Sequence, residues 1–571
     1  MNNLELARIF YEIADILEMK EVEWKPRSYR KAAQAIENLS EDVSEIYKKS
    51  GIKSLEEIPG VGESIAEKIE EFLKTKHIKT YEKLKRSLPK HLTELMEIQG
   101  LGAKRANILY KKLKIKSIKD LEKAAKQHKI SKLQSFKIKT EENILKGIEL
   151  FKKSSQRTLL GIALPIANNL INELKKSKYV NKISVAGSLR RRAETIGDID
   201  ILATSSQPQK VMDLFTALPD VKRILAKGST KSIVLLKNNM QADIRVIEDK
   251  SFGAALQYFT GNKEHNIKLR GIAIKKGLKL NEYGISKKEK YISGKTEEDV
   301  YKTLGLNYMD PELRENTGEI EASLKNKLPK LVSLKDIQGD FHVHTIESDG
   351  NNTIEEMASA AQKLGYEYIC ITDHSKSTYI AHGLKEDRLL GHIKNIRKLQ
   401  KKFKIKIFAG SEIDILPDGT LDYPDEILKK LDIVSVSVHS NFKKQEKDAT
   451  NRIIKALENK YVHILNHPTN RLINEREPLS LDLDKIFKVA SENKKILEIN
   501  SHPNRLDLKD VYIKKAKEYG CKFSISTDAH STNSLRYMEL GVSQARRGWC
   551  EKKDIVNALS LKEIEKLFNI K

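Results

Sequence analysis

The sequence of 571 residues predicts a multidomain protein that is helical at the N-terminus, α+β in the middle and an α/β barrel of about seven strands at the C-terminus. Three observations predict this architecture. Two Gly-x-Gly pairs lie between helical apolar patterns in the first 150 residues. An alternating Asp-Ile-Asp-Ile run, typical of a strand, follows a Gly-Ser turn in the middle. After residue 338, seven short β-branched runs alternate with helical patterns, which favours a parallel barrel.

The charge, the cysteine count and the apolar runs of the sequence indicate the kind of partner and the cell compartment. The net charge of +25 and the pI near 9.4 indicate a polyanionic partner. Residues 151–330 carry 33 Lys and Arg against 20 Asp and Glu, which makes the middle part strongly basic. The three cysteines form no disulfide framework, and this indicates a reducing compartment. The sequence shows no signal peptide and no apolar run of about 18 residues, so we expect a cytoplasmic protein without membrane association. We also expect a monomer.

The helical part carries two Gly-x-Gly pairs that lie forty residues apart. Glycines at the start of a helix let backbone amides approach a DNA phosphate without reading the base sequence. One such pair is weak evidence because it also caps ordinary helices, but two pairs between helices indicate phosphate binding. The predicted DNA-binding glycines are Gly60, Gly62, Gly100 and Gly102.

The middle part carries a predicted two-metal site. Asp198 and Asp200 lie two positions apart on a strand and therefore share a face, where paired carboxylates need cations such as Mg²⁺ or Mn²⁺ between them. A later strand offers a third carboxylate, Asp243. The Gly187-Ser188 turn and Arg191 can hold phosphate oxygens. Asp-x-Asp alone would more often be an exposed acidic strand end, but with these neighbours it predicts phosphoryl transfer.

Histidines crowd the C-terminal third, which holds ten of the fourteen in the chain. Six of the seven apolar runs end in a candidate ligand, and barrel enzymes place their chemistry at the C-terminal ends of strands. The nine candidate ligands are His342, His344, Asp349, His374, Glu412, His439, His467, Asp528 and His530. A lone buried histidine would more often belong to the core, but nine ligands at strand ends predict up to three ions, of Mn²⁺, Zn²⁺ or Fe²⁺ rather than Mg²⁺ alone. Asp373 is expected to orient a ligand.

The motifs of the middle part resemble the palm and thumb of family X DNA polymerases, the family of DNA polymerase beta. The resemblance runs from Gly187-Ser188 through Asp198-Ile199-Asp200 and Asp243-Ile244-Arg245 to residues 258–262. It implies that the three aspartates bind the catalytic metals. The positions that would bind the incoming nucleotide or the new base pair are Gly187, Ser188, Arg191, Gly197, Tyr258, Phe259, Gly261, Asn266 and Arg270. Residues 263–265 depart from the vertebrate pattern, so fidelity and sugar discrimination are not implied.

The first Gly-x-Gly segment, together with residues 29–33, resembles the 5′-deoxyribose-phosphate lyase domain of DNA polymerase beta. By that resemblance Lys68 would be the Schiff-base lysine, and three further residues would contact DNA: Lys25, Tyr29 and Lys79. A nucleophilic amine must be neutral, which requires burial or neighbouring cations. Three glutamates at helical spacing oppose this, Glu63, Glu67 and Glu71, and Ser64 stands where the family has a second lysine. The alternative role of Lys68 is a phosphate-contacting or solvated side chain.

The C-terminal motifs, from His342-Val343-His344 to Thr527-Asp528-Ala529-His530, resemble a PHP (polymerase and histidinol phosphatase) domain. All nine expected ligands are present, which implies an active, metal-dependent site for phosphodiester hydrolysis. The sixth strand departs from the pattern at residues 500–503, and His502 is expected in an outer shell. Lys376, Arg471 and Arg505 lie just beyond strand ends and are candidates for binding substrate phosphate.

The resemblance spans nearly the whole chain and implies a bacterial or archaeal family X DNA polymerase that fills short gaps in base-excision repair. The implied partners are gapped or nicked double-stranded DNA and dNTPs. The PHP domain is expected to act as a 3′→5′ exonuclease, with 3′-phosphatase and AP-endonuclease activities as further candidates. The expected domains are a lyase-like helix-hairpin-helix domain (1–90), a fingers-type helix-hairpin-helix domain (91–150), palm (151–260), thumb (261–320), linker (321–337) and PHP domain (338–571).

Two alternative functions stay open on the sequence. One is another nucleotidyltransferase, such as a tRNA-tailing enzyme, which shares the Gly-Ser and Asp-x-Asp motifs; the two Gly-x-Gly hairpins argue against it. The other is a non-polymerising DNA-binding scaffold that only targets a PHP nuclease. The intact Asp198, Asp200 and Asp243 argue against that scaffold.

Overall fold

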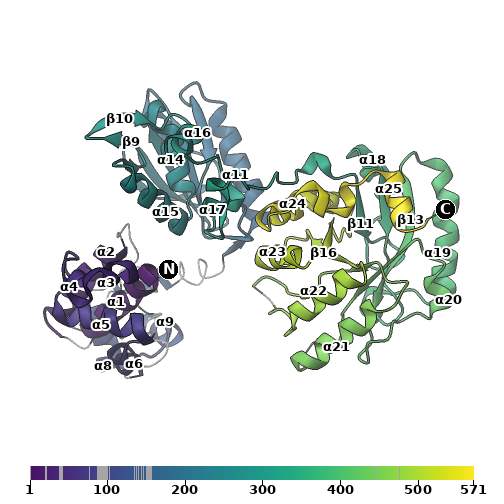
Figure 1. Ribbon diagram of the computed structural model, residues 1–571, viewed down its shortest axis with the longest axis horizontal. Helices are drawn as coiled ribbons and strands as arrows, with labels where there is room; N and C mark the ends of the chain where they lie inside the picture. The colour runs from purple at the N-terminus through teal and green to yellow at the C-terminus, as the bar shows by residue number, and fades with distance from the viewer. Residues whose placement is uncertain are drawn as a thin grey trace.

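The computed structural model describes residues 2–570 except 20–21, 38–42, 76, 87–94, 96–100, 102, 134–135, 137, 139, 143, 146, 149–156, 443 and 475. The chain forms a helical N-terminal part, an α+β middle part and a C-terminal barrel, as the sequence predicts (Figure 1). No described helix is both long and apolar enough to cross a membrane.

The N-terminal part is built from amphipathic helices around two separate cores. The first core joins Leu6, Phe10, Ile69 and Phe72, all with no exposed surface. Its helices are α1 (Asn2–Met19), α2 (Lys25–Glu37), α3 (Val43–Ser50), α4 (Ile52–Glu56), α5 (Glu63–Thr75) and α6 (Lys79–Arg86). The second core lies around α8 (Ala103–Leu113) and α9 (Ile118–Lys126). Two helical cores of this size agree with the predicted pair of helical domains.

The middle part contains a five-stranded mixed sheet with strand order β2-β4-β7-β6-β5. The strands are β2 (Lys182–Val185), β4 (Asp198–Thr204), β5 (Val221–Lys227), β6 (Lys231–Leu236) and β7 (Gln241–Ile247). β4 and β7 are parallel neighbours, whereas the other pairs are antiparallel. α11 (Leu160–Lys175) and α13 (Pro208–Thr216) contribute apolar residues to the core of this sheet. The short α12 (Gly187–Arg190) follows β2, and β1 (Thr158–Leu159) pairs with β3 (Thr195–Ile196).

A smaller subdomain follows the sheet. It includes the predicted thumb, but it begins at Asp249, before residue 261 where the predicted thumb begins. It contains α14 (Phe252–Thr260), α15 (Lys263–Lys275), α16 (Glu297–Thr303) and α17 (Glu319–Leu324), with the 3₁₀ turns η1 (Asp249–Ser251) and η2 (Pro311–Leu313). The strands β8 (Lys279–Asn281), β9 (Gly284–Lys287) and β10 (Lys290–Ser293) form an antiparallel sheet. Its core contains a buried ion network in which Glu297 binds Arg314 at 2.6 Å and Arg190 at 2.5 Å. Burial alone would raise the pKa of Glu297, but the two guanidinium groups hold it at about 2.

This network predicts a strong local effect of one substitution. Glu297→Gln leaves the fully buried Arg314 without its counter-charge, and breaking a buried ion pair costs about 3–5 kcal/mol. The expected result is faster hydrogen exchange throughout α14, α15 and α16, measured by mass spectrometry. The matched control is Glu298→Gln, because Glu298 is the next residue on the same helix and is exposed. Equal protection in the two variants would contradict a stabilising role for the network.

The C-terminal part is a seven-stranded parallel sheet in sequential order, which confirms the predicted barrel. The strands are β11 (Gly339–Val343), β12 (Tyr368–Ile371), β13 (Lys406–Asp414), β14 (Ile433–Ser437), β15 (Ile464–Leu465), β16 (Ile496–Asn500) and β17 (Lys522–Ser526). A bridge between Val343 and Ala529 brings the first and last strands together, so the barrel is nearly closed. The helices are α18 (Ile354–Lys363), α19 (Glu386–Leu399), α20 (Asp425–Leu428), α21 (Glu446–Leu457), α22 (Leu483–Glu492), α23 (Asp510–Glu518), α24 (Met538–Arg547) and α25 (Leu561–Leu567). The 3₁₀ turns are η3 (Leu334–Asp336), η4 (Tyr379–Ala381), η5 (Gln400–Lys402), η6 (Thr532–Tyr537), η7 (Lys552–Asp554) and η8 (Val556–Ala558).

The barrel packs directly against the middle part. Ile473, Leu506 and Leu540 of the barrel belong to the same buried cluster as the core of the five-stranded sheet, called the palm sheet below. Helices α23 and α24 lie on the side of the barrel that faces α17 (Figure 1). The predicted linker is also packed, since Leu331 bridges to Glu551 and Val332 is buried. The two parts therefore share apolar surface as well as a chain connection.

Candidate metal centres

The palm sheet brings the three predicted aspartates together. Asp200 on β4 is the direct register partner of Asp243 on β7, and Asp198 lies two residues earlier on the same face of β4. Burial and the neighbouring carboxylates Asp198 and Asp243 raise the pKa of Asp200 to about 7. Burial and Asp243 also raise the pKa of Asp198. Carboxylates that repel one another in this way are the environment that a hard divalent cation relieves.

Gly187 is required by this arrangement. Its φ is +60°, which favours glycine, and a Cβ built on it would lie 2.1 Å from Oδ2 of Asp200. The turn that begins at Gly187 therefore lies directly against the carboxylate cluster. Arg157, just before β1, donates to Thr195 at 3.0 Å beside Gly197, and its charge partly offsets the rise in the pKa of Asp198 that burial and Asp243 cause.

A surface cavity of about 490 Å³ lies beside this turn, and it collects most of the predicted nucleotide-binding residues. Its lining comprises Arg191, Tyr258, Phe259, Thr260, Gly261, Asn262, Lys263, Asn266 and Arg270. The Asn266 side chain is fixed, since it donates to the carbonyl of Tyr258 at 2.7 Å and accepts from Gln257 at 2.7 Å. Arg191 donates from Nε to Glu315 at 3.0 Å and from Nη1 to the carbonyl of Thr260. Ser188, on α12, is partly exposed.

In the N-terminal part, Lys68 lies on α5, where Nζ donates to the carbonyl and hydroxyl of Ser64 at 2.7 and 2.9 Å. Burial is the largest cause that lowers the pKa of Lys68 and the charge of Lys25 adds to it, although Glu67 and Glu71 act in the opposite direction. Lys25 and Lys79 are exposed, whereas Tyr29 is only 8% exposed and packs its ring edge against Phe10 in the core. Gly60 and Gly62 precede α5, and Gly100 and Gly102 lie outside the described residues.

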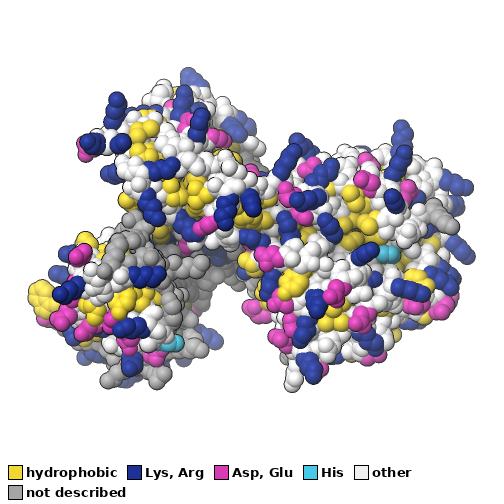
Figure 2. All heavy atoms as spheres, viewed as in Figure 1, with side chains coloured by type: hydrophobic (Ala, Val, Ile, Leu, Met, Phe, Trp, Pro, Cys, Tyr) yellow, Lys and Arg dark blue, Asp and Glu magenta, His cyan; other side chains and the backbone are white. Residues whose placement is uncertain are grey.

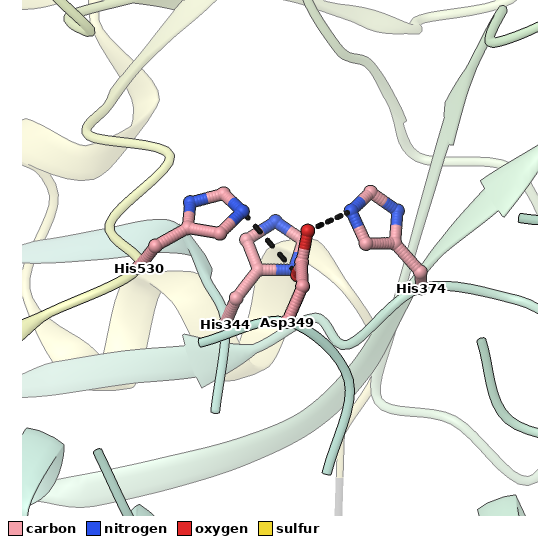
Figure 3. A group of neighbouring side chains, drawn as sticks. All are labelled: His344, Asp349, His374 and His530. Atoms are coloured by element: carbon pink, nitrogen blue, oxygen red, sulfur yellow. Dashed lines mark ion pairs between the residues drawn. The ribbon is translucent and has the colours of Figure 1, made fainter. Parts of the chain in front are cut away.

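The C-terminal ends of the barrel strands gather the predicted ligands into three groups. Within each group, the candidate ligand atoms lie within 4.8 Å of one another. The groups are His344, Asp349, His374 and His530; His342, His344 and Asp528; and His374, Glu412 and His439. Figure 3 shows Asp349 between two histidines of the first group, with its carboxylate 3.5 Å from Nε2 of His374 and 3.3 Å from Nε2 of His530. His467, the ninth predicted ligand, joins this centre through Glu412, from which its Nε2 lies 2.9 Å away.

The chemistry of these atoms fits metal ions. Among the described residues, Nε2 of His342, both ring nitrogens of His344 and Oε1 of Glu412 are buried without a hydrogen-bond partner. Buried polar atoms normally have hydrogen-bond partners. Several buried nitrogen and oxygen atoms without a partner at one place, each able to coordinate a metal ion, therefore indicate a cation site. Burial lowers the pKa of His344 to about 4 and that of His439 to about 3, so both imidazoles are neutral and offer a lone pair.

Several residues that support the ligands were missed by sequence reasoning. Glu498, fully buried on β16, accepts from Nδ1 of His342 at 2.7 Å and from the amide of His467 at 2.6 Å. The only sequence signal for it is a charged residue inside the apolar run Ile496-Leu497-Glu498-Ile499. His392 of α19 lies 3.1 Å from Asp373, which also accepts from Ser348 and thereby fixes the loop that carries Asp349. Such outer contacts set the orientation and basicity of ligands.

The three predicted phosphate-binding cations have different surroundings. Lys376 pairs with Glu386 at 2.5 Å, and Nε of Arg505 lies 3.4 Å from Asp528, one of the predicted metal ligands. Arg471 is only 8% exposed and is engaged elsewhere: it binds Glu194 of the palm at 2.7 Å and donates to the carbonyls of Arg505 and Leu506. Among these three, Arg505 is therefore the cation directly beside the ligand cluster. His502 packs against Tyr537 and belongs to none of the three groups.

Comparisons with known proteins agree with this geometry. Family matches are to a helix-hairpin-helix domain (residues 1–78), a SAM-like helix-hairpin-helix tandem (92–149), the DNA polymerase beta thumb (255–315) and a PHP domain (340–502). A probable phosphatase of Thermoanaerobacter sp. (strain X514) is 36% identical over 204 residues, which are 34% of this chain and 78% of that protein. A probable phosphatase of Acetivibrio thermocellus is 32% identical over 188 residues, 32% of this chain and 70% of that protein.

One relative matches the chain from end to end. The DNA polymerase/3′-5′ exonuclease PolX of Bacillus subtilis (strain 168) is 37% identical over 571 residues, which cover 99% of each protein. The alignment thus spans almost the whole length of both proteins. The chain belongs to the family X DNA polymerases that join helix-hairpin-helix domains, palm and thumb to a C-terminal PHP domain.

Proposed function

We propose that this chain is a DNA polymerase that fills short gaps by two-metal nucleotidyl transfer and carries a separate 3′→5′ exonuclease site in its PHP domain. The observation that supports polymerisation most directly is the Asp198, Asp200 and Asp243 cluster beside the Gly187-Ser188 turn. When bound there, Mg²⁺ or Mn²⁺ would neutralise charge that develops on the transferring phosphate. The chain itself supplies the carboxylates that hold the ions and the cavity that orients the dNTP.

The distribution of charge supports a nucleic-acid partner. Lys and Arg side chains are spread over the visible faces of the palm, thumb, barrel and N-terminal part (Figure 2). Together with the net charge of +25, this favours electrostatic binding of the phosphate backbone without sequence reading. We infer gapped or nicked duplex DNA as the substrate, and short-gap filling in base-excision repair as the role, with the chain acting as a monomer.

The test of the polymerase assignment is extension of a one-nucleotide-gapped duplex with dNTPs, with and without Mg²⁺ or Mn²⁺. Metal-dependent addition of one templated nucleotide is expected. Untemplated addition to RNA would favour a tRNA-tailing enzyme, and no addition on any template would favour a DNA-binding scaffold for the PHP nuclease.

For the PHP site we propose removal of 3′-terminal nucleotides, supported by Mn²⁺ or Zn²⁺ more than by Mg²⁺. Six of the nine predicted ligands are histidines, and imidazole nitrogen favours these borderline transition metals over a hard, oxygen-seeking ion. The candidate phosphatase and AP-endonuclease activities are variations of the same phosphoester hydrolysis and can be read on the same gel with 3′-phosphate and abasic substrates.

A second candidate function, 5′-deoxyribose-phosphate lyase, is favoured by the lowered pKa of Lys68, which has burial as its main cause and Lys25 as a second. Borohydride is expected to trap a covalent adduct between the protein and 5′-deoxyribose-phosphate DNA, and Lys68→Ala to remove it. Lys53→Ala is a matched control, because Lys53 is an exposed lysine on the neighbouring helix α4. Undiminished trapping in Lys68→Ala would assign the nucleophile to another amine.

A further inference from the structure

Glu315 lies where the palm, the thumb and the PHP domain meet, and its carboxylate binds all three. Oε1 accepts from Nε of Arg191 in the palm at 3.0 Å and from Nη1 of Arg547 in the PHP domain at 2.8 Å. Oε2 accepts from Asn262 of the thumb at 2.9 Å. The first of these partners, Arg191, lines the nucleotide cavity. Arg547 of the PHP domain is therefore linked to Arg191, which lines the proposed dNTP site, through the single side chain of Glu315.

Arg547 is held rigidly at this junction. It lies in the last turn of α24, and its side chain is 9% exposed. It forms a two-point pair with Asp510, in which Nε and Nη2 lie 2.9 and 2.6 Å from Oδ2. Its Nη1 donates both to Glu315 and to the backbone carbonyl of Arg191, each at 2.8 Å. Arg547 thus fixes Arg191 twice: directly through its main chain, and through Glu315 at its guanidinium.

We propose that Arg547 is a positioning residue for the polymerase reaction: from the PHP domain, it holds Arg191 in the geometry that receives the triphosphate of the incoming nucleotide. This inference rests on the proposed role of Arg191 in dNTP binding. Within the described residues, the hydrogen bonds of Arg191 use Nε and Nη1, and Nη2 makes none. That nitrogen, in a side chain that lines the cavity, remains for a phosphate oxygen.

The physical reason is the sharing of one carboxylate between two arginines. Because Arg547 takes part of the charge of Glu315, Arg191 binds Glu315 through one nitrogen instead of closing a two-point pair on it. Both arginines lower the pKa of Glu315 against the effect of burial, so the carboxylate stays ionised. Without Arg547, the carboxylate has only one guanidinium partner, and the carbonyl of Arg191 loses its donor. Both changes move Arg191 away from the triphosphate and towards Glu315.

The adjacent residue provides a matched control. Arg546 crosses the same interface from the same helix, and binds Glu312 at 2.8 Å, Asp310 at 3.1 Å and the carbonyl of Val332 at 3.1 Å. It makes no contact with Arg191 or Glu315 among the described residues. Loss of Arg546 therefore weakens the same interface without disturbing the nucleotide cavity.

The experiment compares full-length wild type, Arg547→Ala, Arg547→Lys and Arg546→Ala in steady-state filling of a one-nucleotide gap, with dNTP and DNA varied separately. For Arg547→Ala, the KM for dNTP is expected to rise about tenfold or more, which corresponds to about 1.4 kcal/mol, because Arg191 loses the charge-assisted hydrogen bonds that position it. The KM for gapped DNA and the exonuclease rate should stay at wild-type values. Arg547→Lys keeps the charge but not the fork of donors, and should give an intermediate KM for dNTP. Arg546→Ala should leave it unchanged.

Three outcomes would overturn the proposal: an unchanged KM for dNTP in Arg547→Ala, an equal rise in Arg546→Ala, or a parallel rise in the KM for DNA, each of which indicates a purely structural contact. If Arg547→Ala does not fold, Arg547→Lys decides between the two readings by the same comparison of KM values. Failure of the proposed function itself is distinguishable, because wild-type protein would then fill no gap at all.

Discussion

Asp200→Ala is expected to abolish nucleotide addition while hydrolysis of 3′ ends continues at the wild-type rate. Asp200 is the central carboxylate of the palm cluster, paired in register with Asp243 and in contact with the Gly187 turn. A metal ion contributes several kcal/mol of transition-state stabilisation, and each 1.36 kcal/mol is tenfold in rate, so the loss should be at least about 10³-fold. The measurement is extension of a gapped duplex, with exonuclease digestion of the same substrate without dNTPs.

The control for this variant is Asp213→Ala, which removes an exposed carboxylate of α13 that pairs with Lys227 in the same palm domain. It should fill gaps as the wild type does. If Asp200→Ala lost both activities while circular dichroism was unchanged, the two activities would depend on one centre, and the assignment of separate sites would be wrong.

The double variant His342→Ala with His344→Ala is expected to show the reverse pattern: 3′-end digestion is lost and polymerisation is retained. His342 lies on β11 and His344 directly follows it, and both belong to the group that contains Asp528. Changing even one outer contact of a metal ligand costs about 10–100-fold, so removal of two ligands should lower digestion by at least about 100-fold. Digestion of a labelled 3′ end would be measured in Mn²⁺, together with the metal content of the purified protein.

His463→Asn is a suitable control, because His463 precedes β15 at the other end of the barrel strands and accepts from the amide of Val434. It should retain both metal and activity. Equal digestion by the double variant and the wild type, or a wild-type protein that holds no metal in this domain, would contradict the proposed centre.

The sequence predicted most of the parts but not how they are joined. The seven barrel strands were predictable because each is a short β-branched run and because parallel strands place their C-terminal ends at one edge. Asp198 and Asp200 follow from the two-residue period of a strand. Glu498, His392 and the Glu194–Arg471 pair were not predictable, because each depends on contacts between segments that are far apart in the chain. Local patterns carry no information about such partners.

The contacts of some side chains also depend on residues from other segments, which a sequence motif does not specify. Tyr29 matches a DNA-contacting motif by sequence, but the helical core takes up its ring. Arg471 follows a barrel strand at a position suited to phosphate, yet Glu194 and two carbonyls occupy its guanidinium. In both cases the residue matches the motif in type and spacing, but the surrounding fold decides what the side chain contacts.

The apolar surface shared by Ile473, Leu506 and Leu540 with the palm core bears on how this protein can be divided. A PHP domain cut free at residue 337 would place three core side chains in water, each of which contributes about 1.5–3 kcal/mol when buried. Such a fragment would carry an exposed apolar patch that favours self-association, and the remaining polymerase part would carry the apolar surface that normally covers it. Residue 337 therefore lies between two folds that share one apolar core, and we expect the polymerase part and the PHP domain to stay soluble when joined and to self-associate when separated.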